Sequence, residues 1–157
     1  MTIDLIVVGK SNFDYVINAV DLYSGRLKKY VPFNIVTIPD VKNAKSISQS
    51  ELKTKEGELL CAQFAKYDCV VLLDENGRHY TSVEFAEWIN QRANRSIRRM
   101  CFVIGGAYGF SDEVYRVAHE KISLSKMTFS HQMIRILIVE QIYRAFTILN
   151  GEPYHHV

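Results

Sequence analysis

A chain of 157 residues is long enough for one domain, and its hydrophobic content of 48% is usual for a globular protein. The formal net charge of +2 neither requires nor excludes a nucleic-acid partner, because a local basic patch can bind phosphates. No apolar run approaches the ~20 residues that a membrane-spanning helix needs. We therefore expect a single domain over residues 1–157 and no membrane partner.

Cysteine usage and the first residues suggest where the protein works. Cys61, Cys69 and Cys101 lie in apolar stretches without C-x-x-C spacing, which is typical of buried free thiols in a reducing compartment. Residues 1–9 predict a strand that contains the acidic Asp4, and they show no cleavage pattern of a signal peptide. We expect a cytoplasmic protein.

Hydrophobic periodicity predicts strands that alternate with helices. Asn12 and Ser111 are the expected N-caps of two of the helices, and Gly151 is expected to end the last one. In chain order, the expected strands are 3–9, 33–38, 68–74, 100–104 and 122–124, the helices are 12–29, 48–66, 81–94, 111–119 and 131–150, and the loops include 40–47 and 75–80. This order indicates an α/β fold with a mostly parallel sheet of five to six strands, flanked by helices.

The closing helix is unusually apolar. Between residues 133 and 149 only five side chains are polar, so at 100° per residue apolar side chains cover nearly the whole circumference. A helix with one buried face shows a stripe instead. We expect this helix to be buried in its own core on one side and against a second copy on the other, which predicts a homodimer. The alternative is a central helix of a monomeric core.

Three strands end in loops that suit a ligand, because ligands of open α/β sheets bind outside the carboxyl ends of the strands. Leu73-Asp74-Glu75 follows one strand, Gly105–Gly109 follows the next, and Ser123–Ser130 follows the last. The G-G-x-x-G spacing is a poor match to a dinucleotide fingerprint. On composition alone, the glycines fit a tight turn equally well and the serines fit an ordinary polar loop.

Other polar clusters are less specific. Arg92, Arg95, Arg98 and Arg99 lie between a helix and a strand, where they fit either a solvated helix end or a phosphate contact. The histidine pair His155-His156 has no further histidine or cysteine at the spacing of a metal motif, so we expect no metal. No arrangement of serine or cysteine with histidine matches a nucleophile turn.

Several segments together form a specific pattern. They are Phe102–Gly109, Ile122–Arg135, Glu140–Ala145 and Gly151–His155, together with Ile6–Lys10, Lys55–Glu58 and Leu72–Gly77. With these segments the sequence resembles the RlmH family of SPOUT-class methyltransferases, which methylate N3 of a pseudouridine in 23S ribosomal RNA. The resemblance spans the whole chain and is most specific in the C-terminal half. The chain departs from the family at Lys126 and in its last residues, His155-His156-Val157.

The resemblance implies a SPOUT-type α/β knot with a C-terminal trefoil, a homodimer, and S-adenosylmethionine bound in the knot. The cofactor-binding residues that it implies are Leu73, Gly105, Gly106, Leu124, Ser125, Lys126, Met127, Thr128, Phe129, Ser130 and His131. It also implies that the substrate is 23S ribosomal RNA within the assembled ribosome, and not DNA. The alternatives are a SPOUT enzyme that acts on tRNA and a non-catalytic dimeric RNA-binding module.

For the catalytic residues, the resemblance points to the closing helix and the tail. Arg144 is expected to act electrostatically or on a phosphate, Tyr154 to stack on or orient the base, and His155 to accept the proton of N3. The alternative is that residues 153–155 merely seal the dimer.

Overall fold

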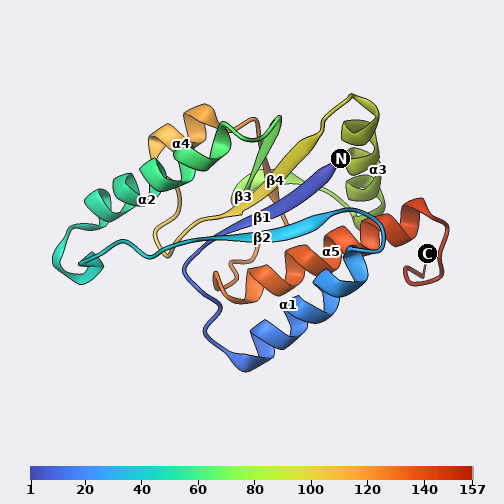
Figure 1. Cartoon of the computed structure of the whole chain (residues 1–157), viewed down its shortest axis with the longest axis horizontal. Helices are drawn as coiled ribbons and strands as arrows, with labels where there is room; N and C mark the ends of the chain where they lie inside the picture. Colours follow the sequence, from blue (N-terminus) through green and yellow to red (C-terminus); the bar gives the residue numbers. More distant parts are fainter. Residues whose placement is uncertain (157) are drawn as a thin grey trace.

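The computed structural model describes residues 1–156, in which a five-stranded parallel sheet lies between two layers of helices (Figure 1). The strand order across the sheet is β2-β1-β4-β3-β5. The strands are β1 (Thr2–Val8), β2 (Phe33–Ile38), β3 (Cys69–His79), β4 (Arg99–Ile104) and β5 (Glu120–Ser123). Every pair of neighbouring strands is parallel, so the predicted fold class is confirmed.

The alternation of side chains along the strands supplies one core on each face of the sheet. In β1, Leu5 and Val7 contribute to the core beneath α1, α3 and α5, whereas Ile6 and Val8 contribute to the core beneath α2 and α4. The helices are α1 (Asp14–Leu27), α2 (Gln49–Phe64), α3 (Ser82–Asn94), α4 (Asp112–Val117) and α5 (Met133–Leu149), with a short 3₁₀ helix at Ala44–Ser46. The sheet is therefore buried on both faces.

Most helix ends follow their sequence signals. The Ser111 hydroxyl accepts the backbone N–H of Val114 at the start of α4, as predicted. Gly151 has a φ of +67° after α5, which is the left-handed conformation that commonly ends a helix. The predicted cap of α1 is wrong, because its N-cap is Phe13 and no side chain bonds there. Asn12 instead donates its backbone N–H to the side chain of Gln132.

Strand β3 is longer than predicted, so the expected loop at 75–80 is wrong. The register with β5 shifts between Leu73 and Arg78, after which Arg78 pairs with Ile122. Gly77 lies so close to β5 that a Cβ there would be 2.6 Å from the carbonyl carbon of Ile122. A glycine within a strand marks such an irregularity. The shift leaves residues 74–76 at the edge where the strand-end loops meet.

Helix α5 lies between α1 and α3 on the sheet (Figure 1). Ile138 and Ile142 have no exposed surface, so packing within one chain explains much of the apolar character of α5. The alternative of a central helix in a monomeric core thus accounts for part of the pattern. One stripe of α5 stays partly exposed and is called the α5 stripe below. It comprises Met133, Leu137, Glu140, Gln141 and Arg144.

All three cysteines are free thiols, and two of the three are buried as predicted. Burial raises the pKa of Cys69 to about 11, and Cys61 is only half-buried. Within residues 1–156, no helix combines the length and the hydropathy needed to span a bilayer.

Candidate functional site

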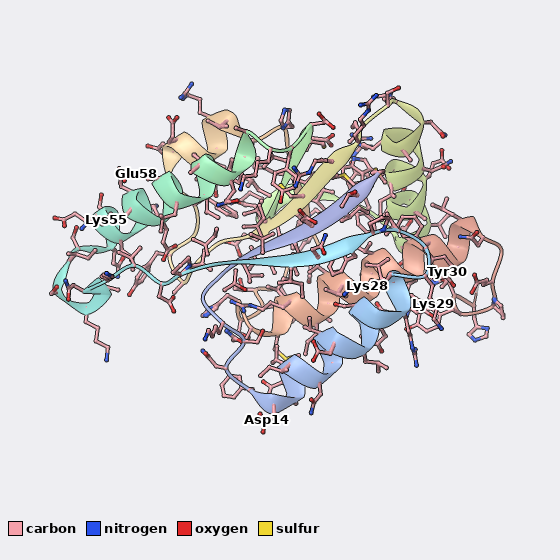
Figure 2. The ribbon with its side chains drawn as sticks, in the orientation of Figure 1. Asp14, Lys28, Lys29, Tyr30, Lys55 and Glu58 are labelled. Carbon is pink, nitrogen blue, oxygen red and sulfur yellow. The ribbon has the colours of Figure 1, made fainter. Side chains whose placement is uncertain are left out.

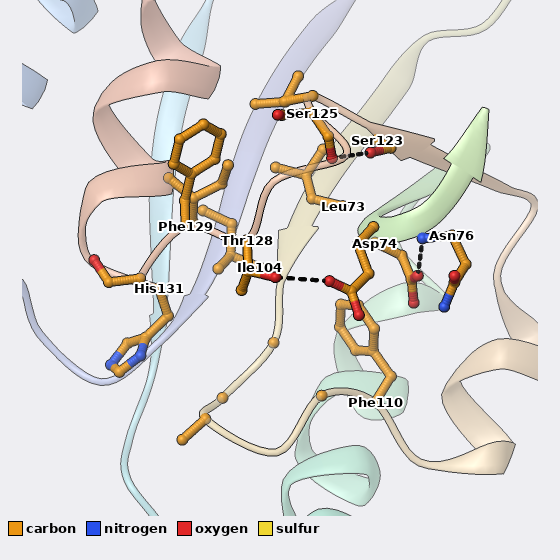
Figure 3. Close-up of a pocket in the computed structure, with 18 of the residues that line it drawn as sticks. Leu73, Asp74, Asn76, Ile104, Phe110, Ser123, Ser125, Thr128, Phe129 and His131 are labelled. Atoms are coloured by element: carbon orange, nitrogen blue, oxygen red, sulfur yellow. Dashed lines mark hydrogen bonds between the residues drawn. The ribbon is translucent and has the colours of Figure 1, made fainter. Parts of the chain in front are cut away.

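The carboxyl ends of β3, β4 and β5 open into a cavity of about 580 Å³ (Figure 3). Strands β4 and β5 contribute their last residues and the loops that follow, and β3 contributes the residues at its register shift. The lining residues are Leu73–Asn76 from β3, Ile104–Phe110 from β4 and its loop, Tyr115 from α4, Ser123–Ser125 and Met127–His131 from β5 and its loop, and Ile134 from α5. The three loops that the sequence singled out therefore meet in one place.

The loop after β5 is anchored at both ends. At its start, the Ser123 hydroxyl donates to the carbonyl of Ser125 at 2.7 Å. At its end, the Gln132 side chain accepts the backbone N–H of Asn12 at 3.0 Å and donates to the carbonyl of Lys10 at 3.2 Å. The loop thus runs from the edge strand β5 across the sheet to the end of β1. These bonds hold both ends of the loop.

Arg135 fixes the first turn of α5 to the same edge of the sheet. Its side chain is almost fully buried and donates to the carbonyls of Val8 at 2.9 Å and Gly9 at 3.0 Å. These bonds satisfy the charged guanidinium inside the protein, because buried polar groups need partners. Arg135 is therefore a structural residue beneath the loop.

Gly105 and Gly106 form the cavity wall at the end of β4, and both are packed against other side chains. A Cβ on Gly106 would lie 2.4 Å from Oε1 of Glu56, and one on Gly105 would lie 3.1 Å from the Phe110 ring. Burial raises the pKa of Glu56, the charge of Asp40 raises it further, and a hydrogen bond from the Gly106 backbone lowers it. A side chain at Gly106 would thus have to displace the Glu56 carboxyl group, and one at Gly105 would press against the Phe110 ring.

The cavity carries negative charge. Asp74 accepts hydrogen bonds from the Tyr115 hydroxyl and from the backbone N–H of Asn76, and Glu75 accepts one from Thr128 at 2.9 Å. Burial, followed by the bond to Asp74, raises the pKa of Tyr115, so this tyrosine stays a neutral donor. Among residues 1–156, no lysine or arginine lines the cavity. The cavity suits a ligand that carries positive charge.

The three predicted catalytic residues come together elsewhere, at the C-terminal end of α5. Arg144 donates to the Glu140 carboxylate from Nε at 3.0 Å and from Nη2 at 2.6 Å. The Tyr154 hydroxyl donates to the same carboxylate at 2.9 Å. Nη1 of Arg144 lies 3.1 Å from Nδ1 of His155. We call this group of four residues the tail cluster.

The contacts of the tail cluster define the protonation of its members. Burial raises the pKa of Tyr154, and the bonds to Glu140 and Tyr23 raise it further, so Tyr154 keeps its proton. Because a guanidinium can only donate, Nδ1 of His155 must accept, and a neutral His155 then carries its proton on Nε2. The free nitrogen of His155 is therefore a donor.

The tail is more ordered than its position at the chain end suggests. Tyr154 and His155 are half-buried, and the Tyr154 ring packs edge-on against Tyr143 with 4.7 Å between ring centres. The remaining described residues of the tail, 152, 153 and 156, are exposed, and no tail residue is part of the core. Val157, the last residue of the predicted tail, lies outside the described residues.

The cavity and the tail cluster are separated within one chain. The cavity reaches α5 at Ile134, whereas the tail cluster is held at Arg144. At a rise of ~1.5 Å per residue these positions are roughly 15 Å apart along the helix. The structure therefore divides the predicted site residues into two groups.

The sequence from residue 1 to residue 155 matches the model of a family described as "Predicted SPOUT methyltransferase". The chain belongs to this family. It is also 52% identical to a "Ribosomal RNA large subunit methyltransferase H" of Parabacteroides distasonis and 53% identical to one of Bacteroides fragilis. In both cases the alignment covers 99% of each chain, so the resemblance to the RlmH family is confirmed.

Solved structures of methyltransferases share the fold of this SPOUT methyltransferase at low sequence identity. A "probable methyltransferase" of Bordetella pertussis has a TM-score of 0.57 at 12% identity and covers 91% of this chain and 95% of its own. A "putative methyltransferase" of Legionella pneumophila, solved with bound SAM, has a TM-score of 0.50 at 14% identity and covers 92% of this chain and 66% of its own. These similarities support the α/β fold class, while the trefoil threading stays a prediction.

Most of the predicted cofactor residues of the SPOUT methyltransferase line the cavity. The exception is Lys126, whose side chain is exposed and does not belong to the lining. Sequence reasoning missed Phe110 and Tyr115, which enter from the next helix and its approach. Phe110 and Tyr115 pack edge-on against each other, and only their spacing around the cap residue Ser111 could have indicated a shared role.

The arginine cluster at residues 92–99 is in part structural. Arg92 bonds to the Glu120 carboxylate and stacks over the Trp88 ring at 4.2 Å. Arg99 lies 3.7 Å from the buried Asp4 carboxylate. These two arginines stabilise the amino-terminal edge of the sheet. Both therefore have partners within the chain, which argues against a role as phosphate contacts.

Proposed function

We propose that this SPOUT methyltransferase transfers a methyl group from S-adenosylmethionine to ribosomal RNA of the large subunit. The observation that carries this proposal is the near-complete coverage, at about half identity, by relatives named for that activity. The acceptor that we propose is N3 of a pseudouridine in 23S ribosomal RNA on the assembled ribosome. A ribosomal substrate also implies a cytoplasmic protein.

The cavity fits S-adenosylmethionine. Its volume of about 580 Å³ is within the usual range for small-molecule sites, and its two carboxylates suit the cationic sulfonium and ammonium groups. The loops at Gly105 and Leu124 offer backbone donors and acceptors to the adenine and the methionine part. When bound, the cofactor supplies a methyl group on a positively charged sulfur.

The tail cluster fits the acceptor base. N3 of pseudouridine is an imide nitrogen that must lose its proton, and the resulting anion spreads its charge over two neighbouring carbonyl oxygens. Nε2 of His155 and the Arg144 guanidinium are donors that can stabilise this charge. The geometry therefore favours His155 as a hydrogen-bond donor to the anion over the predicted role of proton acceptor, and the N3 proton is then released to water. Tyr154, held by Glu140, can orient the base.

A second copy of the chain can bring the two groups together. The α5 stripe runs from Met133, beside the cavity, to Arg144, in the tail cluster. Two copies related by a two-fold axis across this stripe would align their α5 helices antiparallel. The tail cluster of one chain would then lie near the cavity of its partner. We infer a homodimer with two composite sites, each built from both chains.

The substrate can be tested directly. Ribosomes and tRNA from a strain that lacks this gene are incubated with the purified protein and S-adenosylmethionine, and the nucleosides are analysed by mass spectrometry. We expect one methylated pseudouridine in 23S ribosomal RNA and no new methylation of tRNA. Methylation of tRNA alone would contradict the proposed substrate, and no methylation of either would contradict the enzymatic assignment.

The composite site can be tested by complementation. Gly106→Val disables the cavity and His155→Ala disables the tail cluster, so each variant alone should lose at least ~100-fold in methyl transfer, the contribution of one positioned acid–base group. When the two variants are co-expressed in equal amounts, half of the dimers contain one chain of each. In such a mixed dimer, the intact cavity of one chain meets the intact tail cluster of the other, so one of the two sites works. Activity should recover to roughly a quarter of the unmodified level. Without recovery, each site must lie within one chain.

A further inference from the structure

We propose that Arg26 is a phosphate-binding residue of the RNA site, positioned by two tyrosine rings beside the tail cluster. This inference rests on the proposed function, since it takes the tail cluster as the place where the RNA base enters. It adds helix α1 to a site that otherwise consists of α5 and the tail. The ligand is a phosphate group of the RNA backbone next to the acceptor nucleotide.

The geometry of Arg26 is unusual for a surface arginine. Its guanidinium carbon lies 5.7 Å from the centre of the Tyr23 ring and 5.8 Å from the centre of the Tyr143 ring. Two aromatic faces restrict the guanidinium and leave its N–H edge available. Tyr143 also packs against Tyr154, so one chain of rings connects Arg26 to the tail cluster.

Arg26 differs from the other cation of this site in its partners. Arg144 directs three of its nitrogens to Glu140 and His155, so its charge is balanced by a carboxylate. No carboxylate of residues 1–156 lies within 4.0 Å of a nitrogen of Arg26. Glu152, the carboxylate of the tail, accepts the Tyr30 hydroxyl at 2.7 Å. Arg26 therefore offers an uncompensated charge and a free fork of donors.

The end of α1 adds positive charge around Arg26. Lys28 and Lys29 are exposed and lie with Tyr30 at the end of the molecule that carries the tail (Figure 2). Phosphate contacts from arginine and lysine position a protein on RNA without reading its sequence. A stacked arginine with a planar fork suits one specific phosphate, while flexible lysines suit the surrounding backbone.

The chemistry of Arg26 argues against the alternative ligand, the carboxylate of S-adenosylmethionine. In the proposed dimer a phosphate of the RNA and the carboxylate of a bound cofactor would both approach the tail cluster, so a cation there could bind either one. The cofactor, however, binds in a cavity that is built by other loops and that carries no arginine among the described residues. Loss of Arg26 should thus change RNA binding and leave cofactor binding unchanged.

The test compares Arg26→Gln, Arg26→Lys and Arg78→Gln on ribosomes from the strain that lacks the gene. Arg78 is a matched control, because it lies over the Tyr80 ring at 4.9 Å and its replacement removes the same charge. For Arg26→Gln we expect a ~10-fold higher KM for ribosomes, since a hydrogen bond between charged groups is lost, and little change in kcat. The slope of the logarithm of the binding constant against the logarithm of the salt concentration should become shallower by about one, which corresponds to the loss of one phosphate contact.

Arg26→Lys should recover part of the affinity, and Arg78→Gln should behave like the unmodified protein. Melting temperature and calorimetric affinity for S-adenosylmethionine should be the same for all variants. An unchanged KM for Arg26→Gln, an equal loss for Arg78→Gln, or a weaker cofactor affinity would each overturn the proposal. If the unmodified protein itself fails to methylate ribosomes, the proposed function fails, and the two results are distinguishable.

Discussion

The cavity and the tail cluster are built in opposite ways. The cavity is made of loops after parallel strands, with glycine walls and backbone anchors such as Gln132 and Arg135 holding it open. The tail cluster is made of side chains from a helix and a chain end, and its polar groups bond to one another. The first region is a cavity formed within one chain, whereas the second is a set of side chains that already bond to one another.

This difference suggests that the cavity binds the cofactor and the tail cluster binds the RNA. A cofactor that is the same in every reaction suits a rigid pocket within one chain, because preorganisation lowers the cost of binding. A large RNA suits a surface that is completed by assembly and that combines aromatic rings with cations. The predictions below separate the two regions, beginning with the largest effect.

Replacing Leu137 by aspartate should separate the two regions by separating the two chains. Leu137 is half-buried on the α5 stripe, and an unpaired carboxylate in an interface costs several kcal/mol. We expect a folded monomer with normal affinity for S-adenosylmethionine and a loss of methyl transfer of at least ~100-fold. Light scattering, calorimetry and a methylation assay measure these three properties.

The matched control is Leu22→Asp, because Leu22 on α1 is 51% exposed and lies outside the stripe. It should remain dimeric and active. Ile138 is not suitable for this test, since it is fully buried in its own chain and its replacement by aspartate would unfold the core. A fully active Leu137→Asp monomer would contradict the composite site.

The fold was largely predictable, because continuous apolar runs and cap residues act locally. The strand at 68–74 was found from its buried run, but its continuation to His79 was not. That continuation depends on the close approach of Gly77 to Ile122, a tertiary contact that a polar stretch does not reveal. The wrong cap at Asn12 has a similar cause, since its backbone N–H is bonded by Gln132.

The site was predictable only where residues follow strands. Loops at the carboxyl ends of parallel strands meet by topology, which explains why the predicted cavity residues line one space. Helix α1 gave no such indication, so Tyr23 and Arg26 were not linked to the tail. The carboxyl group of Glu56 behind Gly106 was also missed, because a contact between a helix and a loop leaves no periodic pattern.

The wall of the cavity provides a smaller test, on cofactor affinity. In Gly106→Ala the new methyl group would meet the Glu56 carboxyl group, displace it and disturb the wall. We expect a roughly tenfold weaker affinity for S-adenosylmethionine, corresponding to the loss of one charged hydrogen bond of ~1.5 kcal/mol. Methyl transfer at saturating cofactor should stay near normal, because the tail cluster is untouched.

A double-mutant cycle identifies the cause. If the methyl group acts by displacing Glu56, Gly106→Ala should have a smaller effect in a background that carries Glu56→Ala. Calorimetry on the four proteins measures this coupling. Purely additive effects would mean that the methyl group meets the ligand itself.

The smallest effect concerns the pH dependence of stability. Burial and the charge of Asp40 raise the pKa of Glu56, so the folded protein favours its protonated form. A raised carboxyl pKa contributes stability below the pKa of the unfolded chain, and this contribution is lost as pH rises through the folded value. Above the folded pKa, Glu56 is ionised in a buried position, which lowers the free energy of unfolding.

Glu56→Gln should remove this cost, since a neutral amide can still accept the Gly106 backbone bond. We expect a melting temperature ~2 °C above that of the unmodified protein at pH 8, the scale of a small change in unfolding free energy for a chain of this length. The gain should shrink to nothing near pH 4, where both side chains are neutral. Glu58→Gln, at an exposed position on the same helix, should show no such trend (Figure 2). A gain that is independent of pH would exclude ionisation of Glu56 as its source, and a loss at pH 8 would mean that the carboxylate stabilises the wall.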